Sequence, residues 1–99
     1  MSTYRFSAPL WRYKGDSPWH FLTLPFDQAD EIDEITTSVQ RGFGSVRVHV
    51  TVGVTEWSTS LFPATGEQSY ILPVKKAVRV AEGLHEGDTV DVSLRIADL

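Results

Sequence analysis

The residues with the clearest capacity to bind a ligand are three cations that follow Pro73. We expect this proline to start a short helix, because its φ angle is preset for a first helical turn. Lys75 and Lys76 then lie at the positive end of the helix dipole, which disfavours cations, beside free backbone N–H groups that attract anions. Arg79 lies one turn on from Lys75. The three side chains therefore predict a site for a phosphate or a carboxylate.

A solvated or ion-paired helix face is the alternative explanation for these cations. Glu82 shares a stripe with Lys75 and Arg79 at the spacing i, i+4, i+7, which allows an internal ion pair. The basic helix could also dock on an earlier acidic helix that contains Asp27, Asp30, Glu31, Asp33 and Glu34. The helix dipole already explains why those acids lie in first turns. We therefore interpret them as a solvated face rather than as a metal site.

The tryptophans are the second candidate feature. Ligand pockets favour aromatic side chains accompanied by a few polar groups, so Trp11 and Trp19 are candidate ligand-binding residues. In so small a domain, however, aromatic side chains more often fill the core, because they dominate interior burial. We favour the core for the aromatic set, which also includes Tyr13, Phe21, Phe43, Trp57 and Tyr70.

Catalytic and metal-binding spacings do not occur in the sequence. The histidines at 20, 49 and 85 form no His-x-x-x-His or His/carboxylate pattern. The chain has no cysteine, which excludes disulfides, thiolate catalysis and Cys-based zinc sites. No Gly-x-Ser-x-Gly elbow activates a serine such as Ser45, Ser58 or Ser60, and Gly42-Phe43-Gly44 lacks the rest of a phosphate-binding fingerprint. We predict no catalytic residue, no metal and no cofactor.

Composition indicates one soluble globular domain over residues 1–99, with 41% hydrophobic and 22% charged residues. The net charge of −4 disfavours non-specific binding to nucleic acid, which depends on neutralising phosphates. No signal-peptide pattern opens the chain, and no apolar run approaches the roughly 18 residues of a membrane span. We therefore expect a protein outside the membrane. Because a cysteine-free chain fits a reducing compartment, we expect a cytoplasmic location. We also expect a monomer or a weak homodimer.

Apolar periodicity predicts a mainly β chain with two helices, in the order β β α β β β α β. Both helices have apolar positions at helical spacing: the first after an N-cap at Asp27, the second ending at Gly83. The expected apolar faces are Ala29, Ile32, Ile35 and Val39 in the first, and Val74, Ala77, Val78 and Ala81 in the second. The expected strands cover residues 3–13, 19–24, 46–52, 55–62, 70–72 and 90–96. Apolar residues on both faces of 19–24 suggest that this strand is covered on both sides or lies at a barrel seam.

The two halves of the chain form a weak internal repeat. Phe21-Leu-Thr-Leu-Pro25 precedes a helix, glycines and an alternating strand, and Tyr70-Ile-Leu-Pro73 precedes the same series. Repeated units that cannot bury their own apolar faces are expected to pack against each other. A single chain would then behave as a pseudo-dimer whose strands interleave into a small closed barrel.

Part of the second repeat resembles the AbrB/MazE swapped-hairpin proteins, which are dimeric DNA binders and antitoxins. The matching residues are Leu72-Pro73, the basic short helix and Gly83-Leu84-x-x-Gly87-Asp88-x-Val90. Over nearly the whole chain the sequence is more similar to a small bacterial and archaeal family of a domain of unknown function, some of whose members are fused to a YdeI/OmpD-associated domain. That pattern includes Phe6-x-Ala8-x-Leu10-Trp11, Trp19-x-Phe21, Gly42-x-Gly44-Ser45-x-Arg47-Val48, Trp57-x-Thr59-Ser60-Leu61-Phe62-Pro63 and Tyr70-x-Leu72-Pro73-Val74-Lys75-Lys76-x-Val78-Arg79. The resemblance implies a double-split β-barrel and lends no activity.

Three functions are compatible with these features. A non-catalytic module could bind an anionic or small aromatic ligand, or a protein partner, near Lys75, Lys76 and Arg79. A nucleic-acid-binding regulator would follow from the AbrB-like architecture, although AbrB-type binders are basic two-chain assemblies and this chain is acidic. A small enzyme without a recognisable motif is the third hypothesis.

Overall fold

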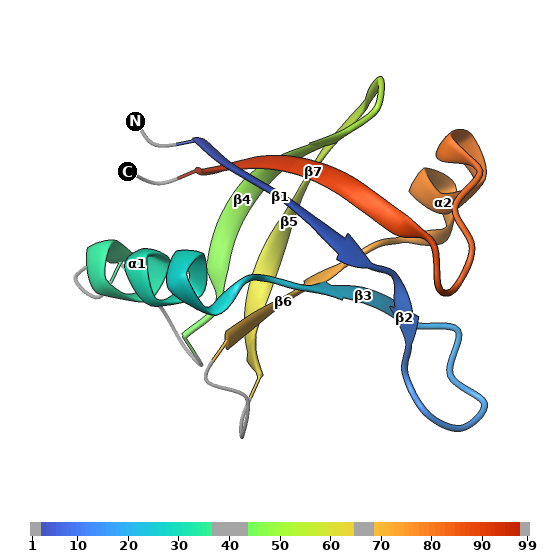
Figure 1. Ribbon diagram of the computed structural model, residues 1–99, viewed down its shortest axis with the longest axis horizontal. Helices are drawn as coiled ribbons and strands as arrows, with labels where there is room; N and C mark the ends of the chain where they lie inside the picture. The colour runs from blue at the N-terminus through green and yellow to red at the C-terminus, as the bar shows by residue number, and fades with distance from the viewer. Residues whose placement is uncertain (1–2, 37–43, 65–68, 98–99) are drawn as a thin grey trace.

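A curled antiparallel sheet and two helices make up the fold, as the computed structural model in Figure 1 shows. The structure describes residues 3–36, 44–64 and 69–97. The predicted end of the first helix, with Val39 and Gly42-Phe43, lies outside these residues. The elements are β1 (Thr3–Pro9), β2 (Trp11–Arg12), β3 (His20–Thr23), α1 (Phe26–Thr36), β4 (Val46–Val52), β5 (Thr55–Ala64), β6 (Ser69–Pro73), α2 (Lys76–Glu82) and β7 (Thr89–Ile96).

The seven strands form one sheet in the order β1-β7-β4-β5-β6-β3-β2, curled into a half-barrel. Its two edge strands, β1 and β2, are consecutive in the chain and are separated only by Leu10. The single strand predicted over residues 3–13 is therefore wrong. Leu10 leaves the ladder because its N–H donates to the carbonyl of Asp88 (2.8 Å) while its own carbonyl accepts from Gly87 N–H (2.7 Å). The segments predicted as strands over residues 3–13 and 19–24 therefore pair with each other only through β2 and β3.

Strands of the two predicted repeats pair directly with each other. β3 pairs antiparallel with β6, with Leu22 opposite Leu72. β4 pairs antiparallel with β7, with Val50 opposite Leu94. Strands from the two halves of the chain are therefore neighbours in one sheet, which is a curled half-barrel.

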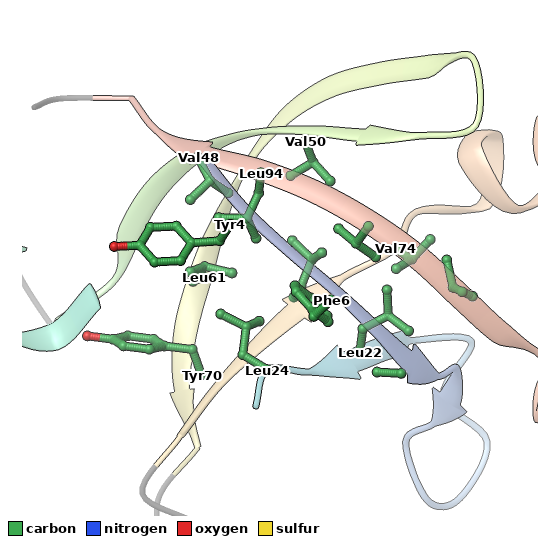
Figure 2. Close-up of a cluster of buried hydrophobic side chains, with 14 of the residues drawn as sticks. Tyr4, Phe6, Leu22, Leu24, Val48, Val50, Leu61, Tyr70, Val74 and Leu94 are labelled. Atoms are coloured by element: carbon green, nitrogen blue, oxygen red, sulfur yellow. The ribbon is translucent and has the colours of Figure 1, made fainter. Parts of the chain in front are cut away.

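Aliphatic side chains from alternate strand positions fill the interior (Figure 2). The side chains with almost no exposed area include Leu10, Leu22, Ile32, Leu61, Leu72 and Leu94, and Tyr4 and Tyr70 add buried aromatic rings. The predicted alternation of β1, β4 and β7 is confirmed by their burial patterns.

The interpretation of the aromatic set as core is confirmed for Tyr70 but wrong for Trp19. Trp19 is 60% exposed, and Trp11 and Trp57 are only half-buried. Leu22 and Leu24 face the core, but in the described part of the chain no layer buries the opposite side chains Trp19 and Phe21. Of the two explanations offered for residues 19–24, cover on both sides is therefore also wrong, and a barrel seam remains a prediction.

Helix α1 begins at Phe26, so Asp27 lies inside the first turn and is not the N-cap predicted from its side chain. The reason is that the carbonyl of Pro25 already accepts the N–H of Ala29 (2.9 Å), which places the first turn two residues earlier. Ala29 and Ile32 are buried as expected, whereas Ile35 is 37% exposed.

Helix α2 begins later than predicted. Pro73 is still paired with Phe21 in the sheet, and Lys75 is the N-cap. Val74 and Val78 are buried, but the predicted face is wrong at Ala77 and Ala81, which are exposed. The predicted stop is confirmed: Gly83 has a φ of 63°, and the next residue donates its N–H back to the carbonyl of Arg79 (2.8 Å). Within the described residues, neither helix is long and apolar enough to cross a membrane.

Candidate functional site

A surface pocket of about 510 Å³ lies between the chain that enters β3, strand β5 and the start of α2. It contains four of the predicted site residues, namely Trp19, Lys75, Lys76 and Arg79. Trp11, the remaining predicted residue, does not line it. The pocket therefore collects the basic cluster and an exposed aromatic ring at one place in the fold.

The cations are positioned in different ways. Lys75 and Lys76 are exposed at the start of α2, and Lys75 precedes the helix instead of lying in its first turn. Because α2 has only seven residues, we attribute the positive character of the site to the side chains rather than to the helix dipole. Arg79 is half-buried, and its guanidinium donates from Nε to the carbonyl of Val74 (3.2 Å) and from Nη2 to the carbonyl of Pro18 (3.5 Å).

These carbonyl contacts orient the guanidinium without neutralising its charge. The predicted ion pair with Glu82 is not formed, because the Glu82 carboxylate accepts from the Thr55 hydroxyl (2.6 Å) and the Val54 N–H (3.4 Å). The only ion pair within the described ranges joins His85 and Asp88. Docking of the basic helix on the acidic helix is also wrong, since Figure 1 shows α1 and α2 at opposite ends of the sheet.

The aromatic side of the pocket is supported from behind. Trp19 stacks on Phe21, with ring centroids 6.2 Å apart and an interplanar angle of 10°. Trp11 contacts the same phenyl ring at 5.0 Å and 35°. Its indole N–H donates to the Thr23 hydroxyl (2.9 Å). Trp11 therefore supports Phe21, which in turn supports the lining residue Trp19.

Two further aromatic lining residues, Trp57 and Phe62, escaped the sequence analysis as a pair. Alternation places them on opposite faces of one strand. However, β5 pairs with β4 up to Leu61 and with β6 from Phe62 onward, so it changes partner between them. Trp57 and Phe62 line the same pocket on either side of this change of partner. No local sequence pattern predicts where the strand changes partner. Phe62 is 44% exposed, whereas Trp57 packs against the core.

The pocket lining contains no Asp or Glu among the described residues, although the chain carries a net charge of −4. Its remaining polar groups include His20, whose Nδ1 lies 2.7 Å from the carbonyl of Pro18, and the hydroxyls of Ser58 and Thr59. Aromatic faces beside unpaired cations suit a ligand that is partly apolar and negatively charged.

The structure also brings His49 and Ser58 together, with Nδ1 and Oγ 2.7 Å apart on paired strands. A catalytic histidine needs an acid that orients it, and within residues 3–36, 44–64 and 69–97 no carboxylate contacts His49. No three potential ligands cluster as a metal site in the same ranges.

The sequence matches the model of one protein family, described as "Domain of unknown function (DUF1905)", over residues 6–94. This match runs from β1 into β7 and so covers nearly all of the fold. The chain belongs to the DUF1905 family. Its similarity to a small domain of unknown function is thereby confirmed. No curated protein matches the sequence significantly. The function of this DUF1905 domain must therefore be argued from its own pocket.

Proposed function

We propose that this DUF1905 domain is a non-catalytic binding module for a small molecule with an aromatic or apolar body and an anionic group. The observation that carries the proposal is the pocket in which Trp19 and Phe62 lie with Lys75, Lys76 and Arg79, without a lining carboxylate. A planar apolar body would contact the aromatic rings, and its carboxylate or phosphate would contact the cations.

Arg79 supports this assignment because its guanidinium is held before a ligand arrives. An ordered side chain loses less conformational entropy on binding than a free one. A guanidinium also presents a planar fork of donors that matches a carboxylate or a phosphate. Lys75 and Lys76 add charge at the rim, where both are exposed.

We further propose that the sheet is an AbrB-like double-split barrel formed by a single-chain pseudo-dimer. The support is the reciprocal pairing: β3 with β6 and β4 with β7. β5 pairs with both β4 and β6. β1 pairs with β7, and β2 pairs with β3. Because both repeats belong to one chain, we propose a monomer or weak homodimer. Its cytoplasmic location, and the fusion of some relatives to a YdeI/OmpD-associated domain, remain expectations from the sequence.

Other partners are weaker alternatives. A nucleic-acid-binding regulator is disfavoured by the net charge of −4. A protein partner would have to place an acidic and aromatic segment in the same pocket. A small enzyme would need an activated nucleophile or an acid–base pair in the pocket. Its lining includes His20, the hydroxyls of Ser58 and Thr59 and the amines of Lys75 and Lys76, but no described hydrogen bond joins a nucleophile to a base among them.

A thermal-shift panel at low salt tests the proposed function. It compares aromatic carboxylates, acyl acids, nucleotides, phosphate and short single- and double-stranded DNA. A ligand at a hundredfold its dissociation constant stabilises the folded state by about 2.7 kcal/mol, which shifts the melting temperature of a domain this small by several degrees. We expect aromatic carboxylates to give the largest shift.

Matched variants assign any shift to the pocket. Lys75→Gln and Lys76→Gln should each reduce it, whereas Lys14→Gln should not, because Lys14 is equally exposed but does not line the pocket. A shift that is equal in all three variants, or a panel without any shift from an aromatic acid, would contradict the proposal. A shift produced by DNA alone would favour the nucleic-acid alternative.

A further inference from the structure

A second pocket, of about 460 Å³, lies over the strands β1, β7, β4 and β5. Figure 2 shows Tyr4, Val48, Val50 and Leu94 of these strands pointing into the core. Successive side chains of a strand point to opposite faces. The residues between them therefore lie on the outer face, and Arg5, His49 and Arg95 among them line the pocket.

Strand register brings the donors of this pocket into one row. Arg95 is opposite Thr3 on one side and His49 on the other, and His49 is opposite Ser58. Directly opposed residues have Cβ atoms about 4.5–5.5 Å apart. Arg5 belongs to the next row on β1 and pairs with Ser93. Two guanidinium groups, an imidazole and hydroxyls are thus within reach of one small anion.

The cations of this row form no ion pair with a described acid, although Asp91 lines a neighbouring pocket together with Arg5. Within the residues that the structure describes, no carboxylate lies at ion-pair distance from Arg5, His49 or Arg95. Glu56 is the one acidic lining residue of the pocket. The cation Arg95 is directly opposite His49, and like charges in that position repel when the imidazole is protonated. An anion between them would remove this repulsion.

We propose that this pocket binds the tetrahedral oxyanion of a phosphate group through Arg5, His49 and Arg95. Arginine offers paired N–H donors that match phosphate oxygens. The contact between His49 Nδ1 and Ser58 Oγ (2.7 Å) fixes the imidazole ring and leaves Nε2 for the anion. The proposal does not depend on the ligand of the first pocket.

Calorimetric titration of the intact protein tests the site with two probes, inorganic phosphate and phenyl phosphate, in a phosphate-free buffer of low and constant ionic strength. Arg95→Gln should weaken both by roughly 10- to 100-fold, as expected for loss of a hydrogen bond to a charged group. Arg47→Gln is the matched control. It removes the same charge from the outer face of the neighbouring strand β4 but does not line the pocket.

NMR of the histidine rings is a second test. Phosphate should shift the His49 signals. It should leave the His85 signals unchanged, because His85 lies outside the pocket. Tighter binding of phenyl phosphate that is also weakened by Arg95→Gln would assign this site to phosphate esters. Equal binding of the two probes would assign it to free phosphate, and both results support the proposal. Lack of binding of either probe, or equal weakening by Arg47→Gln and Arg95→Gln, would overturn it. If Arg95→Gln fails to fold, Arg5→Gln replaces it with the same expected loss.

Discussion

Trp19 and Leu22 lie three positions apart in the chain, and their surroundings are opposite. Leu22 is 0% exposed and points into the core, whereas Trp19 is 60% exposed and rests on Phe21. The larger side chain therefore contributes less to folding than the smaller one. Trp19 is instead available for a ligand at the mouth of the first pocket.

Two alanine substitutions should separate these roles. Leu22→Ala should lower the free energy of unfolding by about 2–5 kcal/mol, because it leaves a cavity in the core. Trp19→Ala should cost only about 1 kcal/mol, close to the value of a stacked aromatic pair. Urea denaturation followed by circular dichroism measures both. An equal loss for both substitutions would mean that Trp19 is buried, in contradiction to an open aromatic pocket.

At the scale of residues, the interpretation of the aromatics as core was right for Tyr70 and wrong for Trp19, for a physical reason. Alternation shows that Leu22 and Trp19 lie on different faces, but it does not show which face another layer will cover. The proximity of Lys75, Lys76 and Arg79 follows from their closeness in the chain alone. The contacts of Arg79 with the carbonyls of Val74 and Pro18 depend on the tertiary fold.

At the scale of elements, the last residue of α2 fastens this helix to the β4–β5 turn. The carboxylate of Glu82 accepts from the Thr55 hydroxyl, and Gly53 lies directly beside it. Gly53 has a φ of 59°, and a Cβ added there would overlap the Glu82 carboxylate. This contact holds α2 against β5 and so positions Arg79, which lies in the middle of the helix.

Gly53→Ala should therefore destabilise the protein by about 1–3 kcal/mol, from the left-handed backbone together with the overlap. In a Glu82→Ala background the same substitution should cost less, because the overlapping carboxylate is gone. A double-mutant cycle by urea denaturation measures the coupling free energy between the two substitutions. For residues in contact this coupling energy is about 0.5–3 kcal/mol. Strictly additive losses would contradict the described contact.

A control substitution separates this contact from a general charge effect. Glu82→Ala should cost about 1–3 kcal/mol, since it leaves the Thr55 hydroxyl without its charged acceptor. Glu86→Ala removes an acid from an exposed position that has no such contact among the described residues, and should change stability by less than about 0.5 kcal/mol. The same urea experiment compares the two, and equal effects would count against a role for the Glu82–Thr55 hydrogen bond.

Local pattern predicted most elements but not their limits. Strict alternation identified β4 and β7, and Gly83 identified the end of α2. The break between β1 and β2 escaped because Leu10 bonds to Asp88 and Gly87, nearly eighty positions away in the chain. The start of α2 escaped because Pro73 is retained in the sheet by its pairing with Phe21.

At the scale of the whole molecule, neither half of the chain has a sheet of its own. β1 from the first half pairs with β7 from the second, and β6 pairs with β3. The core likewise contains side chains from both halves, such as Leu22 and Leu72. The candidate pocket could not be predicted in full for the same reason, since Trp57 and Phe62 join it through the change of partner within β5.

Such interleaving predicts one cooperative unfolding transition. Scanning calorimetry should give a calorimetric enthalpy equal to the van't Hoff enthalpy, of about 70 kcal/mol near 60 °C for a chain of this length. Two resolved transitions, or a calorimetric enthalpy well above the van't Hoff value, would contradict a single unit made of both halves.

The most direct test of the account is a nuclear magnetic resonance titration of the three tryptophan indole N–H signals with naphthalene-1-carboxylate. Trp19 and Trp57 line the first pocket, while Trp11 lies outside it with its N–H bonded to Thr23. Assignment by single Trp→Phe variants makes the signals distinguishable. We expect the Trp19 and Trp57 signals to shift in a saturable manner and the Trp11 signal to stay in place. A shift of Trp11 alone, or no saturable shift of Trp19 and Trp57, would contradict a binding site for an aromatic anion in this pocket.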